Sequence, residues 1–335
     1  MDMSRNVINV GIVGLGQAGL RHLEAFTNLN NVEIQGVADP DKKILNDLEI
    51  KYDFTTFTSY KDLFDLKLDI LVISTPHRYL YQIGVDAANL GINVLIEKPI
   101  ALNLSDATNL VKHCDDKNVK MGVSFVHRYR KEVQKTKEWI LEKKLGKLLL
   151  TNTTMVFPQR QPLPKWLNSP KDSGGGVIMY SAIHSLDMLC WLVNDVCISV
   201  TAKCGTFNQK DKVENFASCM FQFSKGTCST LTVSTNVAVT KGHTWKTNFI
   251  FQNGMITLFI KKYSKYISND NEMSYEAPVN VDVNYNFTDQ ARDYVNCIIN
   301  NKEPFINGND AITSMKIVDA IYESSKCSST IDINY

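Results

Sequence analysis

The feature that most constrains this 335-residue chain is the glycine pattern Gly14-x-Gly16-x-x-Gly19. It follows the apolar run Val7–Val13 directly and precedes a helical stretch, so it predicts a strand, a tight turn and a helix. In this arrangement the first glycine permits the bend and the second admits a phosphate to the backbone. The third lets the helix pack closely on the strand.

A carboxylate, Asp39, follows at the sequence spacing that is typical of dinucleotide-binding turns. Asp39 ends the apolar run Val32–Ala38, about 20 residues beyond Gly19, where it is placed to accept hydrogen bonds from an adenosine ribose. It would also repel a 2′-phosphate, which favours NAD over NADP, although Lys42 and Lys43 partly offset this. The alternative is a structural turn followed by a surface aspartate. The predicted cofactor-binding residues of this segment are Gly14, Leu15, Gly16, Gln17, Ala18, Gly19 and Asp39.

The rest of the first 126 residues alternates between strand and helix patterns. Continuous apolar runs suit strands that are covered on both faces of a parallel sheet. Further strands are expected at Ile70–Ser74, Asn93–Ile96 and Met121–Phe125, and helices at Tyr79–Leu90 and Ser105–Asn118, the latter capped by Ser105. Residues 1–126 therefore predict an α/β domain with a doubly wound parallel sheet, a Rossmann domain.

Residues 127–335 are expected to form a second domain of a different type. A helix over Lys131–Lys144, ended by Gly146, is followed by alternating runs that are typical of antiparallel strands. These runs are Leu148–Phe157, Ile198–Phe207, Phe216–Phe223, Thr227–Val237, Thr247–Gln252 and Met255–Lys261, with hairpin turns at residues 223–227 and 252–255. Helices at Asp289–Asn300 and Ala311–Ser324 close the chain, with the option of packing back on the first domain. The prediction is an α+β domain with a large, mostly antiparallel open sheet.

Composition excludes several classes of partner. Lys plus Arg number 36 and Asp plus Glu 35, a formal charge of +1, which argues against a nucleic-acid binder with a broad basic field. We find no apolar run near the ~18 residues of a membrane span and no signal-peptide pattern. The eight cysteines form no Cys-x-x-Cys pair and do not cluster with histidine, so we expect reduced thiols, a cytoplasmic location and no metal site.

Two later motifs carry chemistry. Glu97-Lys98-Pro99 follows a predicted strand at the carboxyl end of the sheet, where doubly wound folds bind ligands. Lys98 would steady the alkoxide that forms as a hydride leaves, and Pro99 would fix the backbone, with a cis bond as one option. His184 has the side chain best suited to carry a proton near neutral pH. Taken alone, Lys98 could equally be a solvated lysine in a loop, and His184 a structural histidine.

Taken together, the motifs resemble those of the Gfo/Idh/MocA oxidoreductases. The resemblance rests on the glycine pattern, Asp39, Thr75-Pro76, Glu97-Lys98-Pro99 and Gly174-Gly-Gly176 followed by His184-x-x-Asp187, in this order over essentially the whole chain. It implies a Rossmann domain, a C-terminal sheet that often forms the oligomer interface, and oxidation or reduction of a carbinol on a sugar or cyclitol with nicotinamide. A homodimer or homotetramer through that sheet is therefore expected.

The resemblance also assigns residues. By position, Lys98 matches the catalytic lysine of the family and His184 its acid/base histidine. Other positions match segments that line the cofactor, namely Thr75, Pro76, His77 and Glu97. His127 and Arg128 lie in a segment that often approaches nicotinamide or substrate; we assign His127 to the cofactor and Arg128 to the substrate.

One position departs from the family pattern. Members commonly carry Asp four residues before the histidine and Gly two residues before it, where this chain has Tyr180 and Ala182. Loss of a carboxylate beside His184 would leave the imidazole neutral more readily. We hypothesise that Tyr180 shares the acid role and that ketone reduction is the natural direction; the alternative is that Tyr180 packs against substrate. Trp166 offers a flat face for a sugar ring, unless it is an ordinary packed side chain.

The leading interpretation is an NAD(P)-dependent enzyme that interconverts a secondary alcohol and a ketone on a sugar, nucleotide sugar or cyclitol. Its expected substrate-binding residues are Lys98, Arg128, Trp166, Tyr180 and His184. A rival within the family uses tightly bound NAD for transient oxidation in a lyase or hydrolase reaction. A rival from another class is a non-catalytic NAD(H) sensor, which would need neither Lys98 nor His184.

Overall fold

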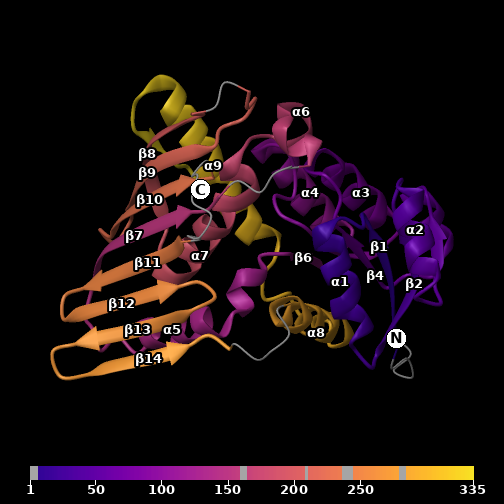
Figure 1. Cartoon of the computed structure of the whole chain (residues 1–335), viewed down its shortest axis with the longest axis horizontal. Helices are drawn as coiled ribbons and strands as arrows, with labels where there is room; N and C mark the ends of the chain where they lie inside the picture. Colours follow the sequence, from indigo (N-terminus) through magenta and orange to yellow (C-terminus); the bar gives the residue numbers. More distant parts are fainter. Residues whose placement is uncertain (1–6, 159–163, 208–209, 236–243, 279–283) are drawn as a thin grey trace. The chain divides into compact units, whose positions relative to one another are not determined.

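The computed structural model of the chain describes residues 7–158, 164–207, 210–235, 244–278 and 284–335. They form two compact units (Figure 1). The first unit comprises Met1–Val126 and Asp282–Ile312, and the second comprises His127–Val281 and Thr313–Tyr335. The sequence predicted one boundary, at residue 126, with all later residues in the second domain. The structure differs from this because the segment 282–312 belongs to the first unit.

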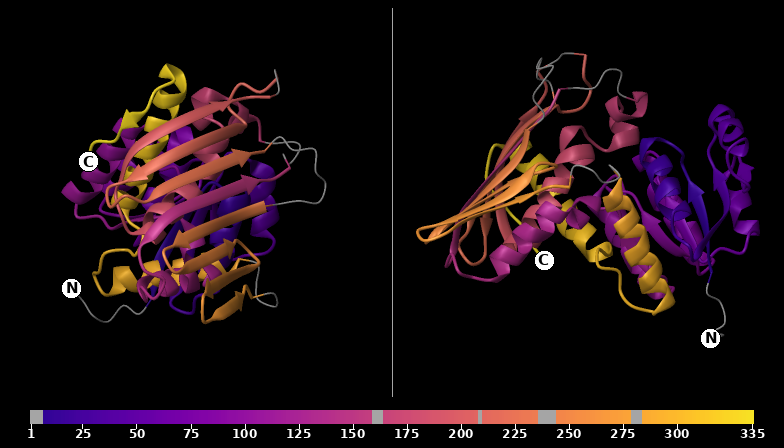
Figure 2. Two further views of the ribbon diagram at one scale, coloured as in Figure 1. Left: turned by 90° about the vertical axis from the view of Figure 1, so that its left-hand side faces the viewer. Right: turned by 60° about the horizontal axis from the view of Figure 1, so that its bottom comes forward.

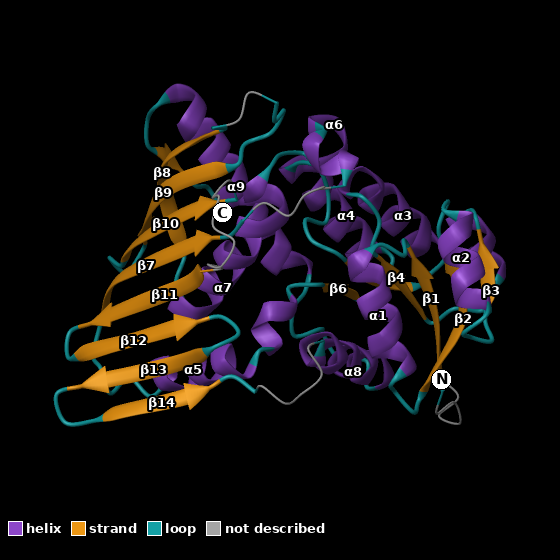
Figure 3. Cartoon of the chain, viewed as in Figure 1, coloured by secondary structure: helices purple, strands orange, loops and turns teal. Residues whose placement is uncertain are grey.

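The first unit is built on a parallel six-stranded sheet in the order β3-β2-β1-β4-β5-β6 (Figure 3). This is the strand order of a dinucleotide-binding Rossmann fold, so the predicted fold class is confirmed. The strands are β1 (Ile8–Val13), β2 (Val32–Ala38), β3 (Thr55–Phe57), β4 (Ile70–Ile73), β5 (Asn93–Ile96) and β6 (Met121–Val123). The helices are α1 (Gln17–Thr27), α2 (Lys42–Glu49), α3 (His77–Asn89), α4 (Leu104–Asp116) and α8 (Tyr285–Ile299).

Helix α8 completes the core of this unit. Its Tyr294 and Val295 are buried in one apolar cluster with Val10 of β1 and Phe26 of α1. The Tyr294 hydroxyl donates to the carbonyl of Val94 at 2.8 Å, which ties α8 to strand β5. Burial of this apolar face explains why a segment so late in the sequence folds onto the first sheet.

The second unit is built on a nine-stranded sheet in the order β14-β13-β12-β11-β7-β10-β9-β8-β15. All its pairings are antiparallel except that of β7 with β10, so the predicted mostly antiparallel sheet is confirmed. Figure 2 shows the helices of this unit on one face of the sheet. The strands are β7 (Leu148–Val156), β8 (Cys197–Gly205), β9 (Phe216–Phe223), β10 (Cys228–Ser234), β11 (Thr244–Phe251), β12 (Gly254–Phe259), β13 (Tyr263–Ser268), β14 (Glu272–Glu276) and β15 (Ile331–Asp332). The helices are α5 (Lys131–Leu141), α6 (Pro170–Ser173) and α7 (Ile183–Val193), together with α9 (Gly308–Cys327), which begins in the first unit.

Two predicted helix ends are corrected by the structure. Helix α4 is capped by Asn103, whose side chain accepts the Asp106 N–H at 2.9 Å, and not by Ser105. An asparagine in extended conformation one residue before the helix satisfies an otherwise unpaired donor, whereas Ser105 is already inside the first turn. Helix α5 ends at Leu141, and Gly146 (φ +78°) forms a separate turn beyond it.

One apolar segment needs a comment. By length and composition, Pro170–Val193 would pass for a membrane-spanning helix, but 67% of its most apolar window is buried inside the fold. Burial of this kind is typical of a core helix, which is apolar around most of its circumference.

Candidate functional site

The glycine loop of the first unit has the geometry of a phosphate cradle. Gly14 has φ +84°, and a Cβ atom there would lie 2.6 Å from the Ser74 carbonyl oxygen. A Cβ atom on Gly19 would lie 1.9 Å from the Gly14 carbonyl oxygen, so both positions require glycine. Gly16 differs, because a Cβ atom there would meet nothing within 4 Å. Gly16 is also the N-cap of α1 without a side-chain cap, which leaves the positive end of the helix to a ligand.

Asp39 is fixed beside this loop. One carboxylate oxygen accepts the Leu15 N–H at 2.7 Å and the other accepts the Asp41 N–H at 2.9 Å. Asp41 in turn caps α2 by accepting the Lys43 N–H at 2.9 Å. Each Asp39 oxygen keeps acceptor capacity for a further hydroxyl, because a carboxylate oxygen carries two lone pairs.

The segment after β4 presents polar atoms in the same unit. The hydroxyls of Ser74 and Thr75 are buried and have no hydrogen-bond partner among the described residues. Pro76 is the N-cap of α3, and His77, its first residue, is buried. Since buried hydroxyls are normally satisfied, the two orphans fit a polar ligand such as the dinucleotide.

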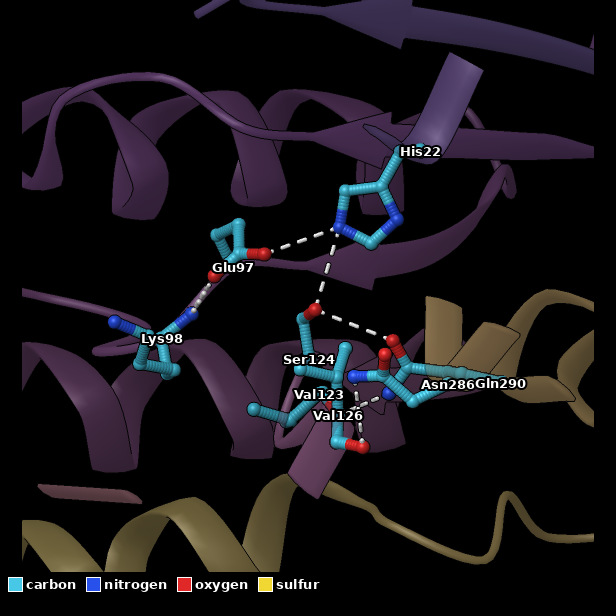
Figure 4. A network of polar contacts seen from close by, with 8 residues as sticks. All are labelled: His22, Glu97, Lys98, Val123, Ser124, Val126, Asn286 and Gln290. Carbon is cyan, nitrogen blue, oxygen red and sulfur yellow. Dashed lines mark hydrogen bonds and ion pairs between the residues drawn. The ribbon is translucent and has the colours of Figure 1, made fainter. Parts of the chain in front are cut away.

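The Glu97-Lys98-Pro99 turn leaves the carboxyl end of β5 with a cis bond between Lys98 and Pro99. The Glu97 carboxylate accepts the Lys98 N–H at 3.2 Å and lies 3.1 Å from His22 Nε2 (Figure 4). Burial raises the pKa of Glu97, but the His22 hydrogen bond and nearby positive charge outweigh it and hold the pKa below its usual value. Burial lowers the pKa of Lys98, and the Glu97 carboxylate partly opposes this. The turn thus holds a carboxylate beside a lysine that gives up its proton more readily than an exposed one.

In the second unit, His184 lies in the first turn of α7, and Tyr180 lies in the π-helical turn Ile178–Ala182 directly before it. π-Turns are rare and frequent at functional sites. Burial raises the pKa of the Tyr180 phenol, a hydrogen bond with Thr235 opposes the rise, and the Glu214 carboxylate adds to it.

The triple glycine before this helix serves packing. Gly174 has φ +74°, and a Cβ atom on Gly175 would lie 2.1 Å from the Tyr322 hydroxyl. Gly176 packs against Glu214, because a Cβ atom there would lie 1.9 Å from the Glu214 carbonyl oxygen. The Glu214 carboxylate accepts the N–H groups of Gly176 and Ile178 at 2.7 and 3.0 Å and the Tyr322 hydroxyl at 2.9 Å. Glu214 therefore fixes the start of the helical segment that carries Tyr180.

An aromatic cluster surrounds His184. The His127 ring lies edge to face with those of His184 and Trp245, with 4.6 Å between centroids in each pair. Arg130 Nε donates to His127 Nδ1 at 2.9 Å, so a neutral His127 carries its proton on Nε2. The indole N–H of Trp245 is buried and has no hydrogen-bond partner among the described residues.

Arg128 and Trp166, two of the predicted substrate-binding residues, have surroundings that differ from each other. Arg128 is 4% exposed, and its guanidinium binds both oxygens of buried Asp187 at 2.9 and 2.5 Å. The structure thus shows an ion pair that ties α7 to the segment before α5. Trp166 is partly buried in the short 3₁₀ turn Lys165–Asn168.

Sequence reasoning missed three residues. His22 is buried and Glu214 is half-buried, and each is paired with partners far along the chain, which no local sequence pattern marks. Trp245 sits in a strand whose start was expected only at Thr247. No group of three or more His, Cys, Asp or Glu side chains is placed to hold a metal within the described ranges.

Two family models match the chain. The model described as "Oxidoreductase family, NAD-binding Rossmann fold" matches residues 8–125, and the model of the GFO/IDH/MocA C-terminal domain matches residues 133–257. One match lies in each unit, and the two support the resemblance drawn from the motifs.

The chain is similar to several curated proteins over part of their length. It is 31% identical over 201 residues to an inositol 2-dehydrogenase/D-chiro-inositol 3-dehydrogenase of Lactiplantibacillus plantarum, covering 57% of this chain and 53% of that protein. It is 26% identical over 233 residues to 1-carboxy-3-chloro-3,4-dihydroxycyclohexa-1,5-diene dehydrogenase of Comamonas testosteroni, covering 68% and 58%. It is 29% identical over 200 residues to a 2,7-anhydro-N-acetylneuraminate hydratase of Escherichia coli, covering 58% and 52%. The matched part therefore spans little more than half of these relatives.

Solved structures match over almost the whole chain. A levoglucosan dehydrogenase in complex with NADH and levoglucosan has a TM-score of 0.88 at 19% identity and covers 98% of this chain and 100% of its own. A dehydrogenase of Bordetella pertussis in complex with NADH and UDP-GlcNAcA has a TM-score of 0.88 at 20% identity and covers 98% and 99%. At this identity the likeness shows the fold.

Proposed function

Since the chain belongs to the GFO/IDH/MocA oxidoreductase family, we propose that it interconverts a secondary alcohol and a ketone on a sugar, nucleotide sugar or cyclitol, with NAD as cofactor. The observation that carries the proposal lies within the first unit. A phosphate cradle at Gly16 and a fixed carboxylate at Asp39 occur at the carboxyl ends of the same sheet as Lys98, which is half-buried and has a lowered pKa.

In this proposal all but one of the residues that hold the cofactor belong to the first unit, and His127 belongs to the second. The backbone from Gly14 to Gly19 binds the pyrophosphate, Asp39 binds the adenosine ribose, and Thr75 offers its buried hydroxyl. Pro76, His77, Glu97 and His127 complete the proposed set. The preference for NAD rests on the Asp39 charge, which repels a 2′-phosphate. When bound, the nicotinamide supplies hydride acceptance or donation.

The proton chemistry is assigned to side chains of this chain. Lys98 donates a hydrogen bond to the carbinol oxygen and stabilises its negative charge. His184 takes the hydroxyl proton in oxidation or returns it in reduction. Tyr180, with a raised pKa, stays protonated near neutral pH and is proposed as a second donor, which favours ketone reduction. Trp166 and Arg128 remain proposed substrate contacts.

A sugar-like substrate is supported by Trp245. Its buried indole N–H has no partner within the described residues and lies in the ring cluster with His127 and His184. A buried donor is costly to leave unpaired, and a substrate hydroxyl would satisfy it. An apolar face with one polar donor also suits a ring that carries hydroxyl groups.

We further propose a homodimer or homotetramer formed through the second sheet. Leu150 of β7 and Met220 of β9 are 47% and 51% exposed, and the strand register places them on the same face. In analytical ultracentrifugation, the Met220→Glu variant should then show a lower particle mass than the wild-type protein.

A second candidate is transient oxidation with retained NAD, which the hydratase among the relatives favours. Mass spectrometry of ligands that co-purify with the protein, followed by a crystal soak with NAD and a polyol, tests both. NAD recovered in full from purified protein, together with turnover that leaves its absorbance unchanged, would favour the second candidate. Failure to bind NAD(H) would contradict both, whereas binding without any turnover would favour a non-catalytic sensor.

A further inference from the structure

We propose that His22 is a positioning residue for Lys98, which acts by holding the Glu97 carboxylate in a buried polar network. The network comprises His22, Glu97, Ser124 and Gln290, and lies entirely within the first unit (Figure 4). The inference rests on the proposed role of Lys98 and adds a residue that none of the sequence motifs includes.

The network joins four elements. His22 comes from α1, Glu97 follows β5, Ser124 follows β6, and Gln290 comes from α8. His22 Nε2 lies 3.1 Å from Glu97 Oε1 and 3.3 Å from Ser124 Oγ, and Ser124 Oγ lies 3.2 Å from Gln290 Oε1. His22, Ser124 and Gln290 are 1%, 0% and 2% exposed, so water competes little for these contacts.

The direction of the hydrogen bonds in this network follows from the Val123 carbonyl, which can only accept. Gln290 must therefore present its amide nitrogen there, at 3.1 Å, and its oxygen to Ser124. The Ser124 hydroxyl proton then goes to Gln290, and Ser124 Oγ faces His22 as an acceptor. His22 Nε2 must therefore carry a proton, which it shares between Ser124 and Glu97.

The other ring nitrogen of His22 agrees with a proton on Nε2. Its Nδ1 atom is buried and has no hydrogen-bond partner within the described residues. A proton on Nδ1 would be a buried donor without an acceptor, whereas a proton on Nε2 has the acceptors named above. Phe287 of α8 packs edge to face on the ring at 5.0 Å and fixes its plane.

The network ends on the backbone of Lys98. The second oxygen of the same Glu97 carboxylate accepts the Lys98 N–H at 3.2 Å. The Ser124 N–H donates to the Ile96 carbonyl at 2.8 Å, which ties the network to the strand before the turn. His22 also lies one turn beyond Gly19 in α1, the helix that starts at the cofactor cradle. Its side chain therefore connects this helix to the turn that carries Lys98. Loss of its donor would free the turn without removing any proposed catalytic group.

The experiment compares two isosteres that place an amide at different points of the ring. His22→Gln puts its amide nitrogen near the Nε2 position, and His22→Asn puts its amide nitrogen near the Nδ1 position. The readout needs no substrate: acetic anhydride labels lysines at one pH, and mass spectrometry compares Lys98 with exposed Lys203 in the same digest. Alkylation of buried Cys114 reports whether the first unit stays folded.

The predicted result follows from the Glu97 charge, which raises the pKa of Lys98. When the Glu97 carboxylate is no longer held, the pKa of Lys98 falls and a larger fraction of its amine is unprotonated. Lys98 in His22→Asn is therefore labelled about 3- to 10-fold faster than in wild type. His22→Gln stays within about twofold of wild type. Glu97→Gln is labelled as fast as His22→Asn, and the double variant His22→Asn/Glu97→Gln is no faster than Glu97→Gln alone, because His22 acts through Glu97.

Equal labelling of Lys98 in the Gln and Asn variants and wild type would overturn the inference, as would additive effects of His22→Asn and Glu97→Gln. Faster alkylation of Cys114 in His22→Asn than in wild type would indicate a general loss of structure and would also overturn it. These results are independent of the proposed function, which fails instead if Lys98→Met leaves turnover of the polyol used for wild type unchanged.

Discussion

The Asp39 carboxylate accepts the Leu15 N–H at 2.7 Å, so the residue proposed to bind ribose also shapes the loop proposed to bind pyrophosphate. Asp39→Asn keeps one acceptor oxygen but removes the charge. We expect NADH to bind about 10-fold more weakly and NADPH to bind better than in wild type, since a charged hydrogen bond contributes about 1.5 to 3 kcal/mol. Fluorescence titration with both cofactors measures this. Unchanged NADH affinity in a folded variant would remove Asp39 from the cofactor site.

Gly16 and Gly19 form a matched pair for testing the cradle. Gly19→Ala would force a Cβ atom to 1.9 Å from a backbone oxygen and should lower the free energy of unfolding by about 3 kcal/mol. Gly16→Ala meets nothing within 4 Å and should leave stability intact, yet weaken NADH binding by about 10-fold because the methyl group occupies the phosphate approach. Urea unfolding and NADH titration separate the two effects. Normal NADH binding by Gly16→Ala would contradict the cradle.

The local roles of these glycines could be predicted from sequence because spacing alone determines them. The same holds for the strands of the first sheet, whose apolar runs are continuous. The α8 segment could not be assigned in this way, since its place depends on Tyr294 reaching a carbonyl of β5 across 200 residues of sequence. The π-turn before α7 also escaped prediction, because its start is set by Glu214, which is 38 residues from Gly176.

Strands β13 and β14 were missed for a related reason. Tyr263–Ser268 and Glu272–Glu276 mix polar and aromatic residues, and their pairing with neighbouring strands, rather than an apolar run, makes them strands. The partners of His22 were hidden in the same way, as they come from three other elements of the first unit.

Glu97 gives the fold a pH dependence of defined sign. Its pKa is held below the ordinary value of 4.5, so its ionised form stabilises the folded state above that pH and the contribution is lost as pH falls through the lowered pKa. Glu97→Gln should cost about 2 kcal/mol of unfolding free energy near neutral pH. The difference from wild type should shrink below pH 4.5. Urea unfolding across this range measures it, and a difference that grows on acidification would contradict the assignment.

Tyr180→Phe tests the shared acid role. If the phenol donates a proton in ketone reduction, its loss should lower kcat by about 10² because a positioned general acid contributes at least that factor. His184→Ala serves as the comparison and should lower turnover further. Steady-state kinetics with NADH and a keto sugar give both values. Wild-type turnover in Tyr180→Phe, with activity abolished in His184→Ala, would leave Tyr180 as a packing residue.

Nicotinamide absorbance with NAD and a panel of sugars and cyclitols, measured for wild type and Lys98→Met, tests the proposed oxidoreductase activity and the role of Lys98 together. We expect wild type to form NADH with at least one polyol. For Lys98→Met we expect kcat to fall by about 10²- to 10⁴-fold, with NADH binding retained. Turnover of the same polyol by Lys98→Met at the wild-type rate would contradict this role of Lys98.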